Sequence, residues 1–368
     1  MRLSELNYKS YINYKKKQID TDLIKAGLKT ESGYTKLGEH LFNVFENNID
    51  LRDLNTIKIG NREYVYSKYG NRDIVKCLSC ECKFDSNDQM DIKRDIEKDG
   101  QKKMELLLTE GATSVNKLLN FVDVEPFKIV KTMIYNTDDG FAAILVLGDR
   151  NVNLEKVKTF LNTSKLELAS ISDVEKLTNS KLGFAGPINL DVSLYADIEL
   201  QCLTNFVVGA NITDHHYINV NLENLNIKGF GDFKVINKND LCPKCSNALT
   251  FEKTLLIKDN NKIYYDLLFS YAFSNNITNL VETHIIVLKN EFLDDAVNFY
   301  NELKKSSFTL LDDRDEKPNV KFNDSELLKP KKVLVIGNKF TEGLIEIREG
   351  SNKKLITTSE FKELVKGN

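Results

Sequence analysis

The sequence has no apolar run close to the roughly 20 residues that a membrane-spanning helix needs, and its N-terminus lacks the apolar core of a signal peptide. We therefore expect a cytosolic protein without a membrane partner. Arginine and histidine are also scarce, with eight and four residues among 368. The net charge of -3 excludes a globally basic nucleic-acid-binding protein, so DNA is not an expected partner, although local basic patches remain open.

What is present is typical of a globular protein with more than one domain. Hydrophobic residues make up 41% of the chain and charged residues 29%, which are ordinary values for such proteins. A chain of 368 residues is too long for one ordinary core and predicts about two to three domains.

Four of the six cysteines form two Cys-x-x-Cys pairs. In a cytosolic chain such pairs favour a metal over disulfides. Four thiolates are the tetrahedral set that structural Zn²⁺ prefers, and they leave no open position for a catalytic water. Unpaired thiols and a decayed metal site remain the alternatives, because the pairs lie far apart and a whole domain would have to be inserted between them. The expected zinc ligands are Cys77, Cys80, Cys242 and Cys245.

The C-terminal part alternates buried strands with helical patterns. Strands are predicted at 283–288 and 332–337, with a helix through Phe292 and Leu303 between them and a terminal helix at 358–365. This alternation predicts a mixed sheet flanked by helices.

The middle of the chain, from Leu106 to Phe233, also has an α/β pattern. Ser114 is placed to cap a helix, and 129–135, 141–147 and 154–161 are predicted as two strands and a helix. Two glycines and a proline follow within five residues, and they indicate a shaped backbone loop in Gly183-Phe184-Ala185-Gly186-Pro187.

The N-terminal stretch has the weakest pattern. We predict a helix over 23–48, a hairpin over 57–66 with Gly60-Asn61 at its turn, and a charged linker or helix over 85–103. We predict that residues 250–280 form a short segment that is rich in strands.

Several segments resemble the bacterial-type prolyl-tRNA synthetases, in the right order along the chain. The middle part resembles their inserted editing domain, a fold shared with free-standing trans-editing deacylases. The segments that carry the likeness are Ile129-Val130-Lys131-Thr132, Leu145-Val146-Leu147-Gly148-Asp149-Arg150, Gly183 to Pro187, Asn205-Phe206-Val207-Val208-Gly209-Ala210-Asn211 and His215 to Asn221.

The flanks of the chain support the same resemblance. Both cysteine pairs stand where the family places its own, and Leu311 to Glu316 resembles a segment of the family's anticodon-binding domain. We therefore expect an α/β (α+β) protein of several domains. The expected parts are a truncated class II-like N-terminal region over 1–105, an editing domain over 106–235, a remnant with the second cysteine pair over 236–280 and an anticodon-binding-like domain over 281–368.

The arginines with which class II synthetases bind ATP are missing from the expected places. There is no Arg from Asn151 to Asp313, where the family's third motif belongs. Lys does not replace the planar, bidentate guanidinium in binding phosphate. We therefore expect that the protein does not bind ATP and is not an active prolyl-tRNA ligase.

The resemblance also implies roles for individual residues. Lys131 matches a lysine that contacts the tRNA 3′ end, and His216 matches a histidine beside the bound aminoacyl group. Gly183, Gly186 and Pro187 match a loop that offers backbone N–H groups to the ester carbonyl. The remaining expected substrate-binding residues are Asp197, Asn211 and Phe206.

Two functions follow as alternatives. The first is hydrolysis in trans of misacylated tRNA(Pro), with alanyl-tRNA(Pro) as the expected substrate, since a small second site discriminates by size. The second is a catalytically silent paralogue that binds tRNA or an amino acid and acts as a regulator. The expected partners are tRNA(Pro) or its aminoacylated 3′ end and a small amino acid, and the oligomeric state is left open.

Overall fold

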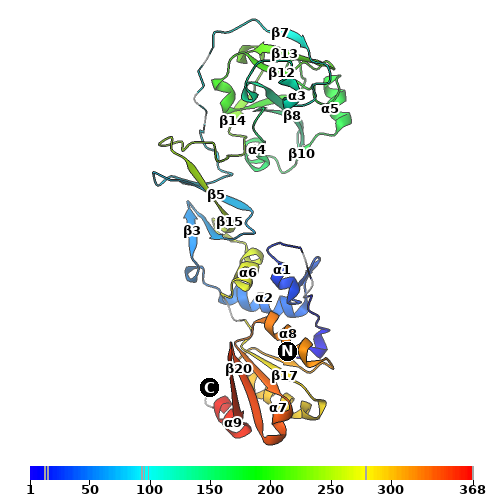
Figure 1. The fold of residues 1–368 in the computed structure, drawn as a ribbon, viewed down its shortest axis with the longest axis vertical. Coiled ribbons are helices and arrows are strands. Elements are labelled where there is room, and N and C mark those ends of the chain that lie inside the picture. The colour runs from blue at the N-terminus through cyan, green and yellow to red at the C-terminus, as the bar shows by residue number, and fades with distance from the viewer. Residues whose placement is uncertain are drawn as a thin grey trace. The chain divides into compact units, whose positions relative to one another are not determined.

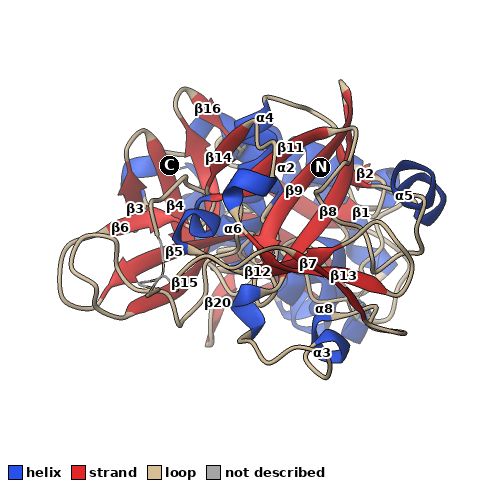
Figure 2. Ribbon diagram, turned by 90° about the horizontal axis from the view of Figure 1, so that it is seen from above, coloured by secondary structure: helices blue, strands red, loops and turns tan. Residues whose placement is uncertain are grey.

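The computed structural model describes residues 1–11, 14, 16–92, 94, 96–97, 99–277 and 280–366. It separates into two compact units: unit one is Met1–Asn71 with Lys253–Asn368, and unit two is Arg72–Glu252. Each unit mixes helices with strands (Figures 1 and 2), which confirms the expected α/β class. Among the described residues, no helix is long and apolar enough to cross a membrane. The four-part division into domains stays a prediction.

The N-terminal lobe of unit one packs helices against a small antiparallel sheet. Its core contains Leu41 and Phe45 from one helix and Phe269 from another, all essentially buried. The sheet has the order β3-β4-β15, and β16 pairs with the far end of β15. The elements are α1 (Thr21–Lys25), β1 (Lys29–Thr30), β2 (Gly33–Tyr34), α2 (Lys36–Asn48), β3 (Thr56–Ile59), β4 (Arg62–Tyr66), β15 (Leu249–Asp259), β16 (Lys262–Ile263) and α6 (Tyr265–Ser274).

The expected single helix over 23–48 is wrong, because the chain leaves the helix after Lys25 and makes the β1–β2 hairpin before α2 begins. Gly27 causes the break. It has φ +66°, and a Cβ there would lie 2.0 Å from the carbonyl oxygen of Lys9. The predicted hairpin over 57–66 is confirmed, with Gly60 at φ +56° between β3 and β4. The stretch 250–280 contains a long strand but also the helix α6, which the prediction missed.

The C-terminal domain of unit one is a five-stranded mixed sheet with the order β18-β17-β19-β20-β21. β17 runs parallel to both of its neighbours, and the last two pairings are antiparallel. The strands predicted at 283–288 and 332–337, the helix between them and the terminal helix are confirmed, while β21 was missed. The elements are β17 (Thr283–Val287), α7 (Leu293–Leu303), β18 (Thr309–Asp312), α8 (Pro318–Leu328), β19 (Lys332–Ile336), β20 (Leu344–Glu349), β21 (Asn352–Thr357) and α9 (Thr358–Lys366).

The first residues of the chain add a short parallel segment to the edge of this sheet. The N–H of Leu3 donates to the carbonyl of Leu311 at 2.9 Å, and the N–H of Leu311 donates to the carbonyl of Met1 at 3.0 Å. The Arg2 guanidinium and the Ser4 hydroxyl both donate to the Asp313 carboxylate. An otherwise open strand edge is thereby covered.

Unit two is built from two sheets that pack around one core, with a small cysteine-containing segment attached. The larger sheet has the order β10-β8-β9-β11-β14 and the smaller one β12-β13-β7. Their shared core contains Leu145, Ala196 and Phe206. The elements are β5 (Arg72–Cys77), β6 (Lys83–Asp85), β7 (Glu105–Leu108), α3 (Val115–Leu118), β8 (Val130–Thr137), β9 (Gly140–Leu147), α4 (Leu154–Leu161), β10 (Leu166–Leu168), α5 (Ile171–Thr178), β11 (Ser193–Asp197), β12 (Phe206–Gly209), β13 (His215–Val220) and β14 (Gly229–Gly231).

The predicted elements of unit two are confirmed at β8, β9 and α4. Ser114 caps α3, with its hydroxyl accepting from the N–H of Lys117 at 3.4 Å. The charged stretch 85–103 has no helix among its described residues; residues 93, 95 and 98 lie outside them.

His284 is a buried histidine at the centre of the C-terminal sheet. Its Nδ1 lies 2.9 Å from the Ser325 hydroxyl, and its Nε2 finds no partner among the described residues. Desolvation by burial lowers the pKa of His284 from 6.5 to about 4. The folded domain therefore holds His284 neutral where the unfolded chain binds a proton.

We predict that the C-terminal domain loses stability as the pH falls from 6.5 towards 4, because the unfolded state takes up a proton that folded His284 refuses. The limiting slope is about 1.4 kcal/mol per pH unit for one group. Amide hydrogen exchange of β17 as a function of pH measures it. His284→Gln, which stays neutral, should flatten this dependence, whereas His215→Gln in unit two should leave it unchanged. Equal slopes for wild type and His284→Gln would contradict the assignment.

Candidate active site and metal centre

Unit two contains a cavity of about 610 Å³ between β8, α5, the loop before β11 and the β12–β13 pair. Its walls are mostly aliphatic, and three of the expected site residues lie on them: Lys131, Gly183 and His216. A largely apolar cavity with a few polar groups is the usual form of a small-molecule site.

Lys131 reaches the cavity from β8. Its ammonium donates to the backbone carbonyl of Arg150, which fixes the direction of the side chain. Burial lowers the pKa of Lys131, and the carboxylate of Asp149 acts in the opposite direction. The ammonium has three donors, so it can still bind a further acceptor.

His216 enters the cavity from β13 and is 4% exposed. Its Nδ1 lies 2.7 Å from the Thr109 hydroxyl, and its ring packs edge-on against Phe184 at 5.5 Å. Burial, with a smaller effect of His215, lowers the pKa of His216 to about 4. A neutral imidazole at pH 7 can accept a hydrogen bond as well as donate one.

The glycine loop is held against β12 by direct backbone contact. A Cβ on Gly186 would lie 1.6 Å from the carbonyl oxygen of Gly209, so no side chain fits there. The side-chain amide of Asn211 fixes the loop with three hydrogen bonds. Its oxygen accepts from the N–H of Gly186 at 2.7 Å, and its nitrogen donates to the carbonyls of Gly186 and Ile188.

This geometry corrects the role expected for Gly186 and Pro187. The N–H of Gly186 is taken by Asn211, and proline has no N–H, so neither can donate to a substrate. Among the described residues, the N–H groups of Gly183 and Ala185 donate to no protein atom, and both residues line the cavity. Any donor for a substrate carbonyl in this loop must come from them.

Three further expected substrate-binding residues do not line the cavity. Asp197 is 1% exposed, and its carboxylate accepts from the N–H groups of Glu199, Phe233 and Lys234. Phe206 is fully buried in the core. Asn211 acts on the loop and not on the cavity. Direct substrate contact has no support at these positions in this geometry.

A buried ionic cluster around Arg150 connects the cavity with the cysteine-containing segment. The Arg150 guanidinium forms bidentate bonds to Glu199, at 2.8 Å twice, and to Asp240, at 2.5 and 3.1 Å. Arg150 is 2% exposed, and its backbone carbonyl is the acceptor of Lys131. The same residue therefore joins the second cysteine pair, through nearby Asp240, to the cavity wall.

The four cysteines of the two pairs converge on one point, and no other metal-ligand group is found among the described residues. The Sγ atoms of Cys77 and Cys245 are 3.4 Å apart, those of Cys80 and Cys242 3.7 Å, and those of Cys80 and Cys245 3.5 Å. All four lie within 4.8 Å of one another. Zn–S bonds of about 2.3 Å in a tetrahedron separate the sulfurs by about 3.8 Å.

Local hydrogen bonds favour a thiolate at Cys245, whereas the pKa of Cys80 is raised to about 12, because a hydrogen bond from the N–H of Cys82 is outweighed by desolvation and by the three neighbouring thiols. The Asn247 amide donates to Cys245 Sγ at 3.4 Å and, with the backbone N–H of Asn247, lowers the pKa of Cys245 to about 6. The N–H of Ser79 donates to Cys77 Sγ at 3.4 Å. The donor set therefore fits a structural zinc ion.

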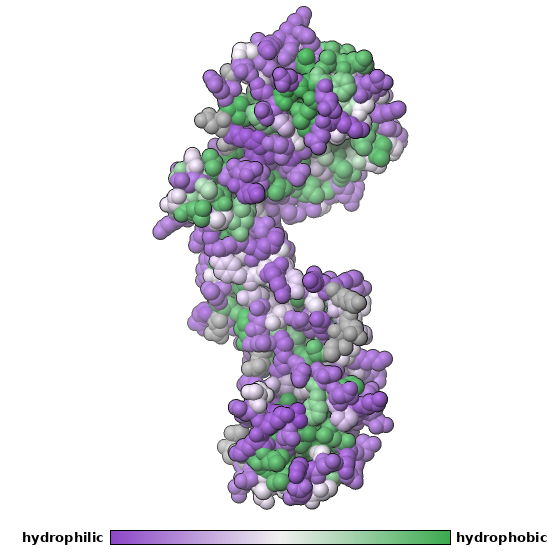
Figure 3. All heavy atoms as spheres, in the orientation of Figure 1, coloured by the Kyte–Doolittle hydropathy of each residue, from purple (hydrophilic) through white to green (hydrophobic). Residues whose placement is uncertain are grey.

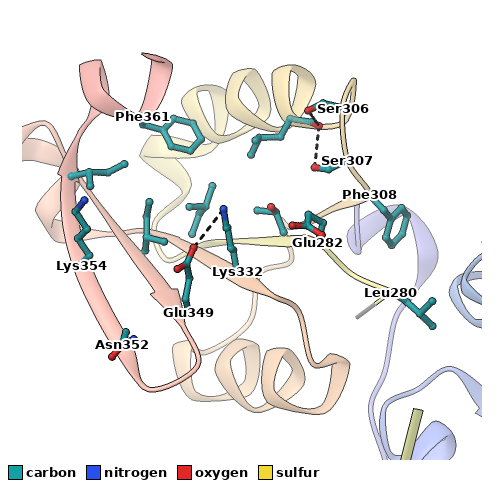
Figure 4. Close-up of a pocket in the computed structure, with 15 residues that line it drawn as sticks. Leu280, Glu282, Ser306, Ser307, Phe308, Lys332, Glu349, Asn352, Lys354 and Phe361 are labelled. Carbon is teal, nitrogen blue, oxygen red and sulfur yellow. Dashed lines mark hydrogen bonds and ion pairs between the residues drawn. The ribbon is translucent and has the colours of Figure 1, made fainter. Parts of the chain in front are cut away.

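A second concavity of about 760 Å³ lies in the C-terminal domain, over the sheet and between the ends of α7 and α9. Figure 4 shows Lys332 beside Glu349, 3.5 Å apart, with Lys354 and Asn352 on the neighbouring strand and Phe361 from α9 facing them. The concavity therefore combines cations, carboxylates, an amide and aromatic rings.

Sequence reasoning missed the residues that support the site. The contact of Thr109 with His216 could not be predicted, because a single threonine before a loop belongs to no recognisable sequence pattern. Phe184 belongs to the glycine loop identified from the sequence, but the sequence did not show that its ring packs against the His216 ring. Arg150 was noticed only as part of a motif, and its two buried carboxylate partners are distant in sequence.

We predict that Arg150→Met destabilises unit two by about 3 to 5 kcal/mol, because buried Asp240 would lose its bidentate partner and buried Glu199 would keep only its longer contact with Arg94 at 3.4 Å. Hydrogen exchange of the β8 and β9 amides measures this. Lys158→Met, which removes a half-exposed contact with Glu155, is the matched control and should cost less than about 0.5 kcal/mol. A similar, small effect for both variants would show that the cluster is not structural.

Comparisons with known proteins match two separate parts of the chain to two domain families. Residues 109–226 match the aminoacyl-tRNA editing domain family, and residues 282–368 match the anticodon binding domain family. The chain is 33% identical over 337 residues to the proline–tRNA ligase of Caldicellulosiruptor saccharolyticus, covering 79% of this chain and 59% of that protein. It is 27% identical over 354 residues to the proline–tRNA ligase of Thermosipho africanus, covering 83% and 63%.

Among solved structures, a proposed trans-editing enzyme for prolyl tRNA synthetase aligns with 36% of this chain and 86% of its own, at 18% identity and a TM-score of 0.33. The chain spans about three fifths of the length of the curated relatives it matches. It is therefore a homologue of the proline–tRNA ligases that combines an aminoacyl-tRNA editing domain with an anticodon binding domain.

Proposed function

We propose that this chain hydrolyses misacylated tRNA(Pro) in trans, with alanyl-tRNA(Pro) as its substrate, and does not aminoacylate tRNA. One observation carries the proposal: Lys131, His216 and the glycine loop, distant in sequence, line a single, mostly aliphatic cavity in the editing domain.

The cavity suits a small aminoacyl group attached to a nucleoside. The walls around Lys131 and His216 are formed by side chains such as Val130, Ile134 and Val174, which favour a small apolar side chain over a polar one. A second site that selects by size is useful because binding alone separates small apolar side chains poorly.

Hydrolysis adds the oxygen of water to the ester carbonyl carbon and releases the ribose oxygen as a hydroxyl. The proposed donors to the negative charge that develops on the carbonyl oxygen are the N–H groups of Gly183 and Ala185, two residues that line the cavity. Neutral His216 orients the water or the substrate through Nε2, while Thr109 holds its Nδ1. The Lys131 ammonium binds an oxygen of the tRNA 3′ end.

The C-terminal domain would supply selection of the tRNA. Its concavity presents Lys354 and Asn352, groups that can bind phosphate and base edges, beside the ion pair of Lys332 with Glu349. In the segment 312–316 of this domain, Asp312 is paired with Arg314 and Asp313 with Arg2, whereas Asp315 and Glu316 are exposed.

We infer the absence of aminoacylation from the segment that lies between the editing domain and the C-terminal domain. The segment between the editing domain and the C-terminal domain has no Arg, and β15 and α6 stand there. Phosphate binding of the class II type needs the bidentate fork of arginine. Proline-dependent exchange of ATP with pyrophosphate should accordingly stay at background.

We also propose that the four-cysteine cluster holds a structural zinc ion, ligated by Cys77, Cys80, Cys242 and Cys245. The ion would close the long insertion at its base and would take no part in hydrolysis, since four thiolates leave no position for water.

We predict that Lys131→Ala and His216→Ala each slow the deacylation of labelled alanyl-tRNA(Pro) by at least about tenfold, since each removes a polar group from the cavity. The exposed Lys165→Ala and the neighbouring His215→Ala are controls and should retain the wild-type rate. Because the pKa of His216 is about 4, His216→Gln should lower the rate without changing its pH dependence between about pH 5.5 and 7.5.

No hydrolysis above the buffer rate by the wild-type chain would refute the enzymatic function. Thermal stabilisation by alanine or proline under those conditions would instead support the regulatory alternative.

We predict about one zinc ion per purified chain, lost in Cys242→Ser and kept in Cys202→Ser, whose thiol lies outside the cluster. Elemental analysis by mass spectrometry measures it. Protein that is free of metal yet has wild-type exchange protection at β5 and β6 would rule out a structural ion.

A further inference from the structure

Asp240 joins the cysteine-containing segment to the contacts that end at Lys131. It stands two residues before Cys242, a span of at most about 7 Å. Asp240 does not line the editing cavity. Its carboxylate nevertheless binds both terminal nitrogens of the Arg150 guanidinium, at 2.5 and 3.1 Å, and the Arg150 carbonyl accepts from the Lys131 ammonium. A neighbour of a proposed metal ligand is thus two contacts away from a residue of the proposed site.

The chain that leads to Asp240 also holds Arg150 through the backbone. The N–H of Val235 donates to the carbonyl of Asn151, the residue after Arg150, at 2.8 Å. One continuous segment, 235–240, is therefore bonded both to the Arg150 guanidinium and to the backbone next to the Arg150 carbonyl. A shift of this segment moves the acceptor to which the editing-site ammonium is bonded.

The place of Asp240 depends in turn on the cysteine pairs. The N–H of Asp240 donates to the carbonyl of Asn237 at 3.0 Å, and its carboxylate accepts from the N–H of Asn237 at 2.8 Å, which closes a tight turn. On either side of Asp240, Ile236 and Cys242 are buried in the small apolar core of the cysteine-containing segment. Cores of this size usually need a metal or disulfides to be stable. A metal ion bound by the four thiolates would therefore fix the turn that carries Asp240.

Burial distinguishes Asp240 from the charged side chains on the surface. Figure 3 shows many hydrophilic side chains on the face of unit two that it draws, and ion pairs between such exposed groups contribute little. Arg150, Glu199 and Asp240 are each at most 5% exposed. A buried charge is stable only with its partner in place, so a displacement of Asp240 must also displace the Arg150 guanidinium.

We propose that Asp240 is a positioning residue for Lys131, which it fixes through Arg150, and that metal binding at the cysteine pairs holds Asp240 in place. This inference rests on the hydrolysis and the zinc site proposed above, and it makes the first depend on the second. Loss of the ion releases Asp240, then Arg150 and then Lys131, although every residue that lines the cavity is still present. Because a displacement of about 1 Å in a site can slow a reaction by about a hundredfold, a small shift is enough.

The first measurement follows the Lys131 ammonium itself and needs no ligand. Proton–nitrogen NMR of the full chain detects its hydrogens, and the signal is identified by its loss in Lys131→Arg. Asp240→Asn should raise the rate at which these hydrogens exchange with water by about fivefold or more, because their carbonyl acceptor is no longer held in place. Removal of the metal with a chelator should have the same effect, and added zinc should reverse it.

Asp138→Asn is the matched control for this measurement. Asp138 follows β8 at the end distant from Lys131, and its carboxylate accepts from the N–H of Ser164 at 2.6 Å and from the Thr163 hydroxyl at 2.9 Å. The same change of Asp to Asn in the same unit should leave the exchange of the Lys131 ammonium at the wild-type rate.

The second measurement is a double-mutant cycle on binding. The ligand is tRNA(Pro) that carries alanine through an amide in place of the ester, so that it is not hydrolysed. Asp240→Asn should weaken its binding about tenfold in the wild-type chain and less than about twofold in Lys131→Ala, because residues that act through one another are not additive. Equal weakening in both backgrounds would show that Asp240 only stabilises unit two, and it would overturn the inference.

Unchanged exchange of the Lys131 ammonium in Asp240→Asn would also overturn it. An effect of Asp240→Asn without an effect of the chelator would reject the part of the cysteine pairs. These outcomes are distinct from the fate of the proposed hydrolysis. Faster exchange in Asp240→Asn of a chain that does not deacylate alanyl-tRNA(Pro) would keep the inference and reject the hydrolase. Deacylation at the wild-type rate by Asp240→Asn, with unchanged exchange, would keep the hydrolase and reject the inference.

Discussion

The editing domain depends on one buried ionic contact, that of Arg150 with Glu199 and Asp240. The guanidinium neutralises the two buried carboxylates, and the carbonyl of the same residue directs Lys131. A second buried group of charges lies beside it, where Lys156 and Lys234 share Asp232. Such clusters tolerate little rearrangement, because each charge is stable only with its partner in place.

The order of these contacts explains how a cavity with few polar groups can be specific. Lys131 is held by Arg150, His216 by Thr109 and Phe184, and the glycine loop by Asn211. Each of these groups is thus fixed by a neighbour that does not line the cavity. Preorganised donors of this kind require no reorganisation during a reaction.

The periodic elements could be predicted from the sequence, since β8, β9 and α4 follow from local hydrophobic patterns. The break of the N-terminal helix could not, because it depends on the contact of Gly27 with the distant carbonyl of Lys9. In the site, the resemblance identified Lys131 and His216, and the cavity brings them together. It also suggested Gly186 as a donor, and only the position of Asn211 shows that this N–H is already bonded.

The four cysteines also show what the sequence could not predict. Their spacing predicted four ligands but could not show convergence, which depends on the return of the chain after a whole inserted domain. Contacts between distant residues, and not a local pattern, bring the four sulfur atoms together.

The central claim is selective hydrolysis by the retained editing domain. It is tested most directly by incubating the full chain with alanyl-tRNA(Pro) and prolyl-tRNA(Pro) side by side and following release of each labelled amino acid. The account predicts rapid loss of alanine, little loss of proline and no release by Lys131→Ala. Equal release of both amino acids, or none of either, would contradict it.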